Sequence, residues 1–527
     1  MALLASAFIL VLHVRLWSQA GPLWRDEINT LVVATQPTLR ELWARLDGES
    51  FPILPFVLLR AWCGAGLGSS DAGLRAFGLL VGVAILAVLW LNRRLLGPSP
   101  PLLSLALFGL SPVVLRWGDS VRGYGLAALT ILLTFGLLFR ALGRRRPADV
   151  GLAAVAAVAS VQALYQNGVL LLAMGVAGAA VAWRRGRRRA ALLSLGIGAV
   201  AALSLLPYAG VVARSREHTA VSVEPITLGS LLSVVSRALG TDPGLQGPVR
   251  AMPFVWAAVL VAAVVAAALR LRPGGAWPAS RRRRDLALYG LVTLSIALPL
   301  YLTLLLRVGF RTQPWYYVAL MALAVCCAES MLEAPSTGFR LARLCGVGAL
   351  VGLAAPGVHE YLGSRQTNMD WVVASLGSPS REDLVVVTPW YYGVSFNRYY
   401  HGAAPWATLP PLEDKSLHRP DLVKRQLAAE DPVGPLFERV RATLESGHRV
   451  FVVGSLGSRV MERPPRLPPA PGVPTGWWQG TYGANWSAQL QFDLQSHARS
   501  AQALDAAGSQ AVIPYEIAAA WVVEGWR

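Results

Sequence analysis

Apolar runs of about twenty residues recur through the first two thirds of the chain, separated by short segments rich in arginine. A helix of that length crosses a hydrocarbon core of about 30 Å. Inside lipid every backbone amide must be satisfied within its own segment, so these runs are predicted to be helices. The predicted spans are residues 2–17, 74–93, 100–117, 123–141, 149–165, 168–183, 189–211, 252–271, 285–307, 313–333 and 339–357.

One apolar segment does not fit this series. Residues 51–63 (FPILPFVLLRAWC) are apolar but short, with Pro52 and Pro55 near the start. Counting the segment as a span would reverse the side of every later loop. We therefore interpret it as a juxtamembrane or re-entrant helix on the outer face, although the sequence does not decide whether residues 51–67 cross the membrane.

The last third of the chain has a different pattern. Residues 383–389 (DLVVVTP) and 448–454 (HRVFVVG) are short β-branched runs bounded by turn signals, which predicts strands. A polar, helical stretch at 420–446 lies between them, and a Pro-rich loop follows at 464–474. The predicted organisation is a transmembrane domain at 1–360, with an outer loop at 18–73, and an extracytoplasmic α/β domain at 361–527.

Composition and charge support a membrane protein. Of 527 residues, 54% are hydrophobic and only 15% are charged, too few charges to cover a soluble protein of this length. The net charge of +18 does not indicate nucleic acid, because the arginines gather in short loops between apolar runs. With the N-terminus inside, every such cluster falls on the cytoplasmic side. The fold class predicted is an α-helical polytopic protein of the inner (plasma) membrane, with about 11–13 transmembrane helices.

Two carboxylates, Asp26 and Glu27, stand side by side just after the first span. At the membrane surface such a pair can supply a general base and a positioning or metal-binding group. The alternative is structural, with Asp26 as the N-cap of a helix and Glu27 as an acid of its first turn.

A second polar turn at the outer face contains Asp119, Arg122 and Tyr124. Ionisable residues at the membrane edge are costly, so they are functional candidates by default. Asp119 is a candidate second acid, and Arg122 a candidate ligand for a phosphate. The alternative is a local ion pair or helix cap at the end of a span.

A third polar group lies across the outer turn between the spans at 285–307 and 313–333. It contains the candidate substrate-binding residues Arg307, Arg311, Tyr316 and Tyr317. These residues can grip a lipid-linked phosphate and line a groove for its carrier. An aromatic belt with snorkelling arginines explains the same residues equally well. The predicted alternation places all three polar groups on one face of the membrane, which favours a single site.

The ordered motifs of the first 140 residues resemble the GT-C superfamily of glycosyltransferases. The resemblance is to the branch of protein O-mannosyltransferases and the lipid A aminoarabinose transferase. It rests on four pieces in order: Asp26-Glu27, the proline-opened stretch Phe51–Pro55, Leu74-Arg75-Ala76-Phe77, and Ser111-Pro112 followed by Asp119, Arg122 and Tyr124.

This resemblance implies an inverting transfer of a hexose or pentose from a polyprenyl-phosphate carrier to an acceptor hydroxyl on the outer face. The loop aspartate of the family carries over to Asp26 as general base, and Glu27 is implied to orient the acceptor or the base. Some members of the family need a divalent metal and others do not, so a metal is left open. Sugar, acceptor (lipid, glycan or protein) and oligomeric state are not decided by the sequence.

Two other classes of protein remain possible from the sequence. A transporter or flippase of a lipid-linked saccharide would share the spans and the arginines, but transporters usually contain related halves, and none is detected here. A non-catalytic membrane scaffold would leave the work to the outer domain. In that domain Asp414, His418, Arg419 and Asp421 form a polar group with some character of a metal site, although charges of a surface loop explain it better.

Overall fold

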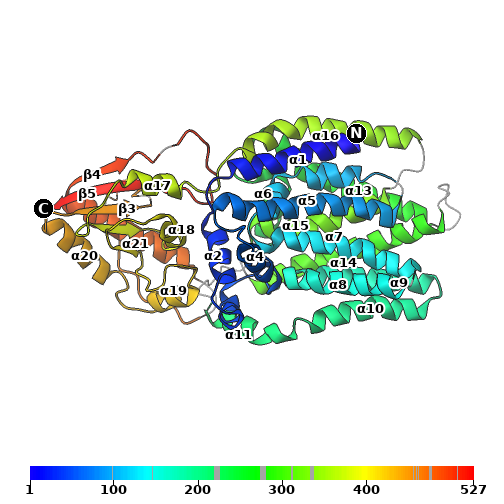
Figure 1. Cartoon of the computed structure of the whole chain (residues 1–527), viewed down its shortest axis with the longest axis horizontal. Coiled ribbons are helices and arrows are strands. Elements are labelled where there is room, and N and C mark those ends of the chain that lie inside the picture. The colour runs from blue at the N-terminus through cyan, green and yellow to red at the C-terminus, as the bar shows by residue number, and fades with distance from the viewer. Residues whose placement is uncertain are drawn as a thin grey trace. The chain divides into compact units, whose positions relative to one another are not determined.

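The computed structural model forms two compact units (Figure 1). The helical unit comprises residues 1–19, 49–210 and 226–363, and the sheet unit comprises residues 20–48, 211–225 and 364–527. Residues 20–48, expected as part of the first outer loop, thus group with the tail of the chain. The structure describes residues 1–97, 99–144, 146–218, 226–272, 280–309, 312–332, 337–454, 456–457, 460, 462–473, 477–506 and 508–527.

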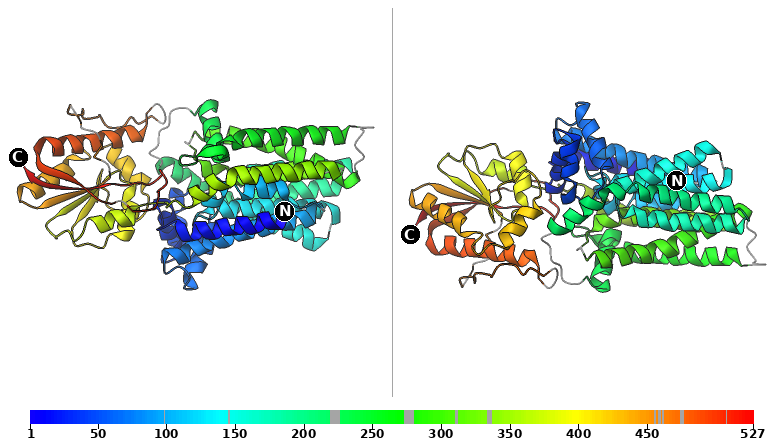
Figure 2. Two further views of the ribbon diagram at one scale, coloured as in Figure 1. Left: turned by 90° about the horizontal axis from the view of Figure 1, so that it is seen from above. Right: turned by 90° about the horizontal axis from the view of Figure 1, so that it is seen from below.

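The long helices of the helical unit lie side by side and nearly parallel in Figure 1 and in both views of Figure 2, and short helices lie among them. Their bounds are α1 (Ala2–Gln19), α4 (Leu54–Gly64), α5 (Asp71–Leu96), η2 (Ser104–Gly109), α6 (Pro112–Gly118), α7 (Gly123–Arg144), α8 (Pro147–Ala163), α9 (Asn167–Arg184), α10 (Arg188–Leu203), η3 (Leu206–Tyr208), α12 (Leu228–Ser236), η4 (Arg237–Thr241), η5 (Gly247–Ala251), α13 (Met252–Leu271), α14 (Arg281–Val308), η6 (Pro314–Tyr317), α15 (Val318–Met331) and α16 (Thr337–Leu362). Helix α11 (Ala209–His218) begins at the edge of this unit.

Eight helices of the described residues are long and apolar enough to cross a membrane, and the chain is a multi-pass membrane protein. Helix α4 falls in the short segment that the sequence left open. It has 11 residues and therefore rises about 16 Å, roughly half of a hydrocarbon core. A short helix is what we expected for residues 51–63.

The span predicted at 100–117 is not one continuous helix, so this prediction was wrong in detail. A π-helix, η2, ends at Gly109, and α6 begins anew at Pro112. Proline cannot continue a helix but suits a first turn. The hydroxyl of Ser111 accepts a hydrogen bond from the Val114 amide and so caps the new helix. The break places the turn at 119–122 directly after α6.

The sheet unit is built on five strands, β1 (Leu384–Val387), β2 (Trp406–Thr408), β3 (Arg449–Val453), β4 (Ala498–Leu504) and β5 (Ala520–Trp526). Their order is β2-β1-β3-β5-β4, in which β1 is parallel to both β2 and β3, while β5 is antiparallel to β3 and to β4. The helical segments of the unit are α2 (Arg25–Ala34), α3 (Leu39–Ala44), η1 (Leu46–Gly48), α17 (Met369–Ser375), α18 (Tyr392–Tyr399), α19 (Pro420–Leu427), α20 (Gly434–Glu445) and α21 (Gln479–His497).

Alternate residues of β1 enter two different cores. Leu384 and Val386 pack with α19, α20 and α21, whereas Val385 and Val387 pack with α17 and α18. Because both faces of the sheet are covered, the strand is apolar at every position. This explains why β1 and β3 were found in the sequence at residues 383–389 and 448–454. The polar stretch at 420–446 forms two helices, α19 and α20, in place of one.

Candidate functional site

The acidic pair lies in the first turn of α2, where the helix dipole favours negative charge. Its two members have different surroundings. Glu27 is fully buried, and its Oε2 accepts a hydrogen bond from the Trp24 amide at 3.4 Å, at the start of the same helix. The side chain of Asp26 keeps 21% of its surface exposed. Glu27 therefore has a structural role in the helix start, and Asp26 is the member of the pair that solvent can reach.

His418 lies beside the carboxylate of Asp26. Its Nε2 is 3.4 Å from Oδ1 of Asp26, and its backbone amide donates a hydrogen bond of 2.7 Å to Oδ1 of Asn29, one turn further along α2. The indole of Trp390 meets the imidazole edge to face at 5.8 Å. These contacts hold the loop of His418 against α2 and direct the imidazole toward Asp26.

Arg25 anchors the start of α2 from the other side. Its Nε lies 3.5 Å from Asp26, and its guanidinium lies 4.7 Å from the ring centre of Tyr391. Its Nη1 is 3.5 Å from the fully buried carboxylate of Glu516, which also accepts a hydrogen bond of 3.1 Å from the Arg25 amide. Burial lowers the pKa of Arg25, but Asp26, Glu516 and two neighbouring tyrosines together raise it above its ordinary value. Arg25 thus stays cationic beside Asp26.

Glu516 is the centre of a buried polar network. Besides Arg25, the hydroxyls of Ser395 and Thr367 donate to its Oε1 at 2.6 and 2.8 Å. Burial raises the pKa of Glu516 above its ordinary value, although these three partners oppose the change. The network connects the start of α2 with α18 and with the segment before α17.

Two aromatic residues that follow β1 contact the neighbours of Asp26. Trp390 and Tyr391 come after the carboxyl end of β1, and they contact His418 and Arg25 respectively. In open α/β sheets, ligand sites form outside the carboxyl ends of parallel strands, where neighbouring connections leave in opposite directions. Within the sheet unit, Asp26 therefore lies with residues from the position where such folds place their ligands.

The polar group at residues 414–421 consists mainly of ion pairs. Arg419 bridges Asp414 and Asp421, each at 2.7 Å. In the ranges that the structure describes, no three His, Cys, Asp or Glu side chains gather as metal ligands. The neighbours of Asp26 include a single imidazole, that of His418, and the cationic guanidinium of Arg25. These residues do not fit a divalent metal, so we derive no step through one.

Asp119 belongs to the helical unit and is a buried partner of a histidine. Its Oδ2 lies 2.6 Å from Nδ1 of His13 on α1, and the residue is 7% exposed. Gly78 and Gly82 of α5 leave the room that its backbone and side chain occupy. The cavity beside the pair measures only about 10 Å³. This surrounding suits a buried structural pair better than a substrate site.

Arg122 and Tyr124, the other members of the second polar group, contact aromatic and acidic side chains. Nη1 of Arg122 is 3.7 Å from the carboxylate of Glu49, and its guanidinium lies 5.0 Å from the ring of Phe51. Tyr124 packs edge to face on Phe51 at 4.8 Å and on Tyr316 at 5.9 Å. The structure thus brings Tyr124 of the second polar group into contact with Tyr316 of the third.

The remaining candidates are spread over the end of α14 and the turn after it. The Tyr317 hydroxyl lies 3.0 Å from that of Thr312, and Tyr317 is buried. Arg307 is exposed near the end of α14. Arg311 lies outside the described residues.

Sequence reasoning missed four residues that the structure places beside the candidates: His13, Glu49, His418 (as a neighbour of Asp26) and Glu516. Their partners lie far away along the chain, so no local pattern joins them. Only Glu516 could have been suspected from the sequence. It is the single acid in the apolar run 511–523, and an acid buried in such a run rarely lacks partners.

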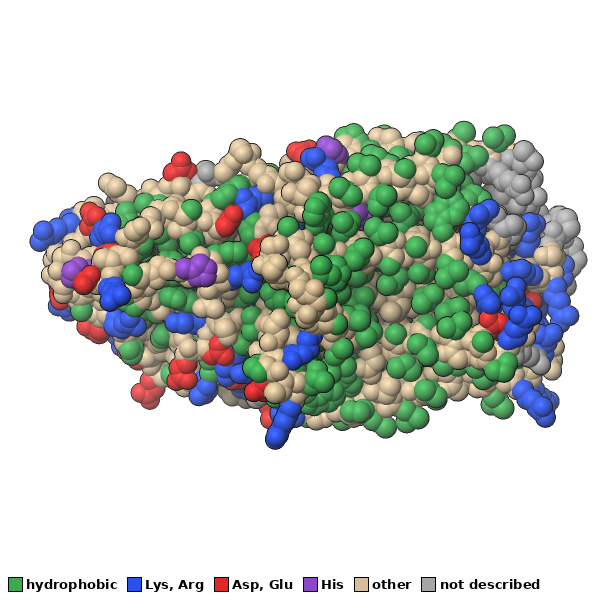
Figure 3. All heavy atoms as spheres, viewed as in Figure 1, with side chains coloured by type: hydrophobic (Ala, Val, Ile, Leu, Met, Phe, Trp, Pro, Cys, Tyr) green, Lys and Arg blue, Asp and Glu red, His purple; other side chains and the backbone are tan. Residues whose placement is uncertain are grey.

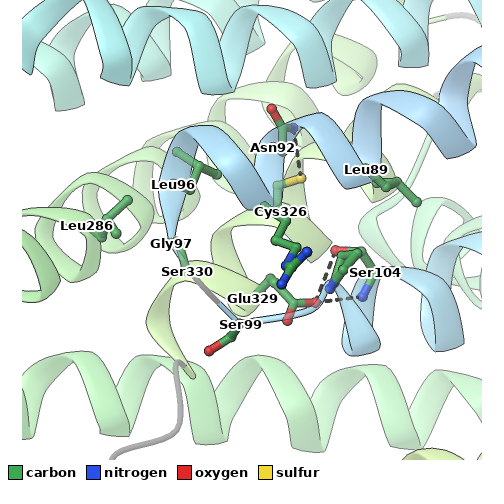
Figure 4. Close-up of a pocket in the computed structure, with 12 residues that line it drawn as sticks. Leu89, Asn92, Leu96, Gly97, Ser99, Ser104, Leu286, Cys326, Glu329 and Ser330 are labelled. Carbon is green, nitrogen blue, oxygen red and sulfur yellow. Dashed lines mark hydrogen bonds between the residues drawn. The ribbon is translucent and has the colours of Figure 1, made fainter. Parts of the chain in front are cut away.

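A small pocket in the helical unit contains another buried carboxylate (Figure 4). Glu329 of α15 accepts hydrogen bonds from the amide and the hydroxyl of Ser104, at 2.8 and 3.2 Å. It therefore satisfies the first turn of η2, where the backbone leaves α-helical geometry. The pocket measures about 40 Å³, enough for a few water molecules and too small for a sugar.

The sequence matches no protein-family model, and no curated protein is similar to it at a significant level. Similar folds occur among solved structures. One is ArnT from Cupriavidus metallidurans bound to undecaprenyl phosphate (14% identity, TM-score 0.46, 86% of this chain and 92% of that chain). Another is the oligosaccharyltransferase of Archaeoglobus fulgidus tethered to an acceptor peptide (11% identity, TM-score 0.48, 86% and 69%). With TM-scores below 0.5, we transfer no residue role or substrate from them.

Proposed function

We propose that this protein is a membrane glycosyltransferase that moves a sugar from a polyprenyl-phosphate carrier to an acceptor hydroxyl. Asp26 is the general base. The observation that carries the proposal is the difference within the acidic pair. Glu27 is buried in the start of α2, whereas Asp26 is reachable and lies between Arg25 and His418. The order of motifs that resembles the GT-C superfamily supports the same reaction.

In the proposed reaction the acceptor oxygen attacks the anomeric carbon from the side opposite the carrier phosphate, which inverts the configuration. A carboxylate oxygen of Asp26 takes the hydroxyl proton as the new bond forms, and the carrier phosphate leaves with the electron pair of the broken bond. His418 and Arg25, at 3.4 and 3.5 Å, orient the carboxylate.

We place the reaction at the outer face of the plasma membrane, with the sheet unit outside the cell. The arginine clusters at residues 184–189 and 281–284 support this orientation, because cationic loops stay on the cytoplasmic side.

The test uses the full chain, purified in detergent, with radiolabelled polyprenyl-phosphate sugars and a membrane extract as the source of acceptors. Asp26→Asn should lower transfer by about 10²–10⁴-fold, the usual effect of losing a general base. The matched control is Asp493→Asn, because Asp493 is also a partly exposed aspartate, paired with Arg463 at 2.9 Å. The control should keep wild-type activity.

Three results would contradict the proposal. Full transfer by Asp26→Asn, with folding verified by size-exclusion chromatography, would remove Asp26 as the base. Equal loss in Asp493→Asn would mean that the effect is general. Labelled carrier that crosses the bilayer of proteoliposomes while its sugar stays attached would identify a transporter in place of a transferase.

A further inference from the structure

A large cavity lies at the arginine-rich end of the helical unit. It measures about 750 Å³ and is formed by the last turns of α5 and α7, the turn between α9 and α10, and the first turn of α14. Figure 3 shows Lys and Arg side chains gathered at this end of the helical unit. Its lining contains one aspartate, Asp285, and seven arginines: Arg94, Arg140, Arg144, Arg185, Arg187, Arg281 and Arg282.

Only some of these cations are balanced by carboxylates. Arg140 pairs with Asp149 at 2.8 Å, and Arg185 pairs with Asp285 at 2.9 Å. Arg282 donates a hydrogen bond of 2.9 Å to the carbonyl of Leu95. Four lining arginines have no acceptor within the part of the chain that the structure describes: Arg94, Arg144, Arg187 and Arg281. The cavity thus has an excess of positive charge and unused hydrogen-bond donors.

The positive-inside rule explains why arginines occur in short cytoplasmic loops, because their charge orients the spans. It does not explain why such arginines would surround a cavity. Here side chains from four separate segments of the chain converge on one space, with Phe139, Leu91 and Leu95 as an apolar part of its wall. The guanidinium fork matches two oxygens of one phosphate or carboxylate, which favours such an oxyanion over a simple halide. The volume is much larger than one phosphate ion needs.

We propose that this cavity binds the phosphate headgroup of an anionic phospholipid, with the glycerol and first methylene groups against Phe139 and the leucines. Basic pockets between transmembrane helices on the cytoplasmic side suit such headgroups, because anionic lipids are concentrated in that leaflet. The site is independent of Asp26 and of the proposed transfer. Free inorganic phosphate offers the same oxygens, and the experiment distinguishes the two sources.

The experiment uses the full chain, delipidated in a neutral detergent and observed by native mass spectrometry. Phosphatidylglycerol is the anionic probe, phosphatidylcholine is the zwitterionic control, and inorganic phosphate is tested alone and as a competitor. The variant Arg144→Gln/Arg187→Gln removes two exposed cations of the lining. Arg188→Gln/Arg189→Gln is the matched control, because it removes two exposed arginines of the same end that do not line the cavity.

Wild type and the matched control should retain phosphatidylglycerol in preference to phosphatidylcholine. The cavity variant should bind it about tenfold more weakly for each arginine removed, as expected for a lost charge-assisted hydrogen bond. Equal binding by the two double variants would overturn the proposal. Binding of inorganic phosphate with no preference for the lipid would overturn it as well, by assigning the cavity to a soluble anion.

Discussion

The buried carboxylate of Glu516 offers the sharpest test of how the acidic pair is held in place. Glu516→Ala removes the acceptor for the hydroxyls of Ser395 and Thr367 and for the amide of Arg25, at 2.6, 2.8 and 3.1 Å. Leaving a buried polar group without a partner costs about 1–3 kcal/mol, and breaking a buried ion pair about 3–5 kcal/mol. Because Arg25 keeps 18% of its surface exposed and can regain water, we expect a loss of about 3 kcal/mol for the sheet unit.

Glu516→Gln separates the shape of this side chain from its charge. The amide keeps one oxygen where Ser395 and Thr367 donate their hydrogen bonds, so the loss should be clearly smaller than with alanine. The assay is thermal unfolding of the purified full chain, followed by tryptophan fluorescence. Glu524→Ala is the control, because Glu524 is an exposed glutamate of β5 and its removal should change stability by less than about 0.5 kcal/mol.

Transfer activity gives a second measurement for the same variants. If Glu516 fixes the start of α2, then Glu516→Ala should lower the turnover of the folded fraction as well as its stability. Unchanged stability in Glu516→Ala would refute the reasoning, because it would show that the network contributes no net free energy. Lower stability with full turnover would show that the position of Asp26 does not depend on Glu516.

Two further predictions concern packing and pH. Gly78→Ala should abolish stable folding, because its Cβ would lie 1.7 Å from the Asp119 carbonyl oxygen. Gly151→Ala is the control: nothing lies within 4 Å of an added Cβ there, so the yield of folded protein should not change. The hydrogen bond from Arg419 lowers the pKa of Asp421, so its contribution to stability is present above the unfolded pKa of about 3.9 and is lost as pH falls through the lower folded value. The difference in unfolding midpoint between wild type and Asp421→Asn should therefore shrink below about pH 4, and a constant difference would contradict this assignment.

Elements that depend on local periodicity were predictable from the sequence. The helices α5, α7 and α14 follow from apolar runs long enough for lipid, and β1 and β3 follow from β-branched runs between turns. The strand β4 (ARSAQAL) was not predicted, because its exposed edge position gives it no apolar alternation. The helix α21 was missed although its buried Tyr482, Trp486, Leu490 and Leu494 recur every four residues, a spacing typical of a helix.

The candidate site was predictable only in part. The sequence located Asp26 and Glu27 and gave both readings of the pair, but it could not tell which acid is buried. The difference depends on two contacts. The carboxylate of Glu27 accepts a hydrogen bond from the Trp24 amide, and the imidazole of His418 lies beside Asp26. The family resemblance implies that Glu27 orients the acceptor or the base, and this role remains a prediction. The contact of Glu27 that the structure shows is the hydrogen bond at the start of α2.

The sequence by itself determined that this chain spans a membrane many times, since the cost of unsatisfied backbone in lipid acts on each segment separately. It also determined the cationic loops and the apolar strands of the sheet. Tertiary structure decided the partners: His13 for Asp119, His418 for Asp26 and Glu516 for Arg25. Such pairs join residues more than a hundred positions apart, and their energies depend on burial and distance, which no local pattern of residues contains.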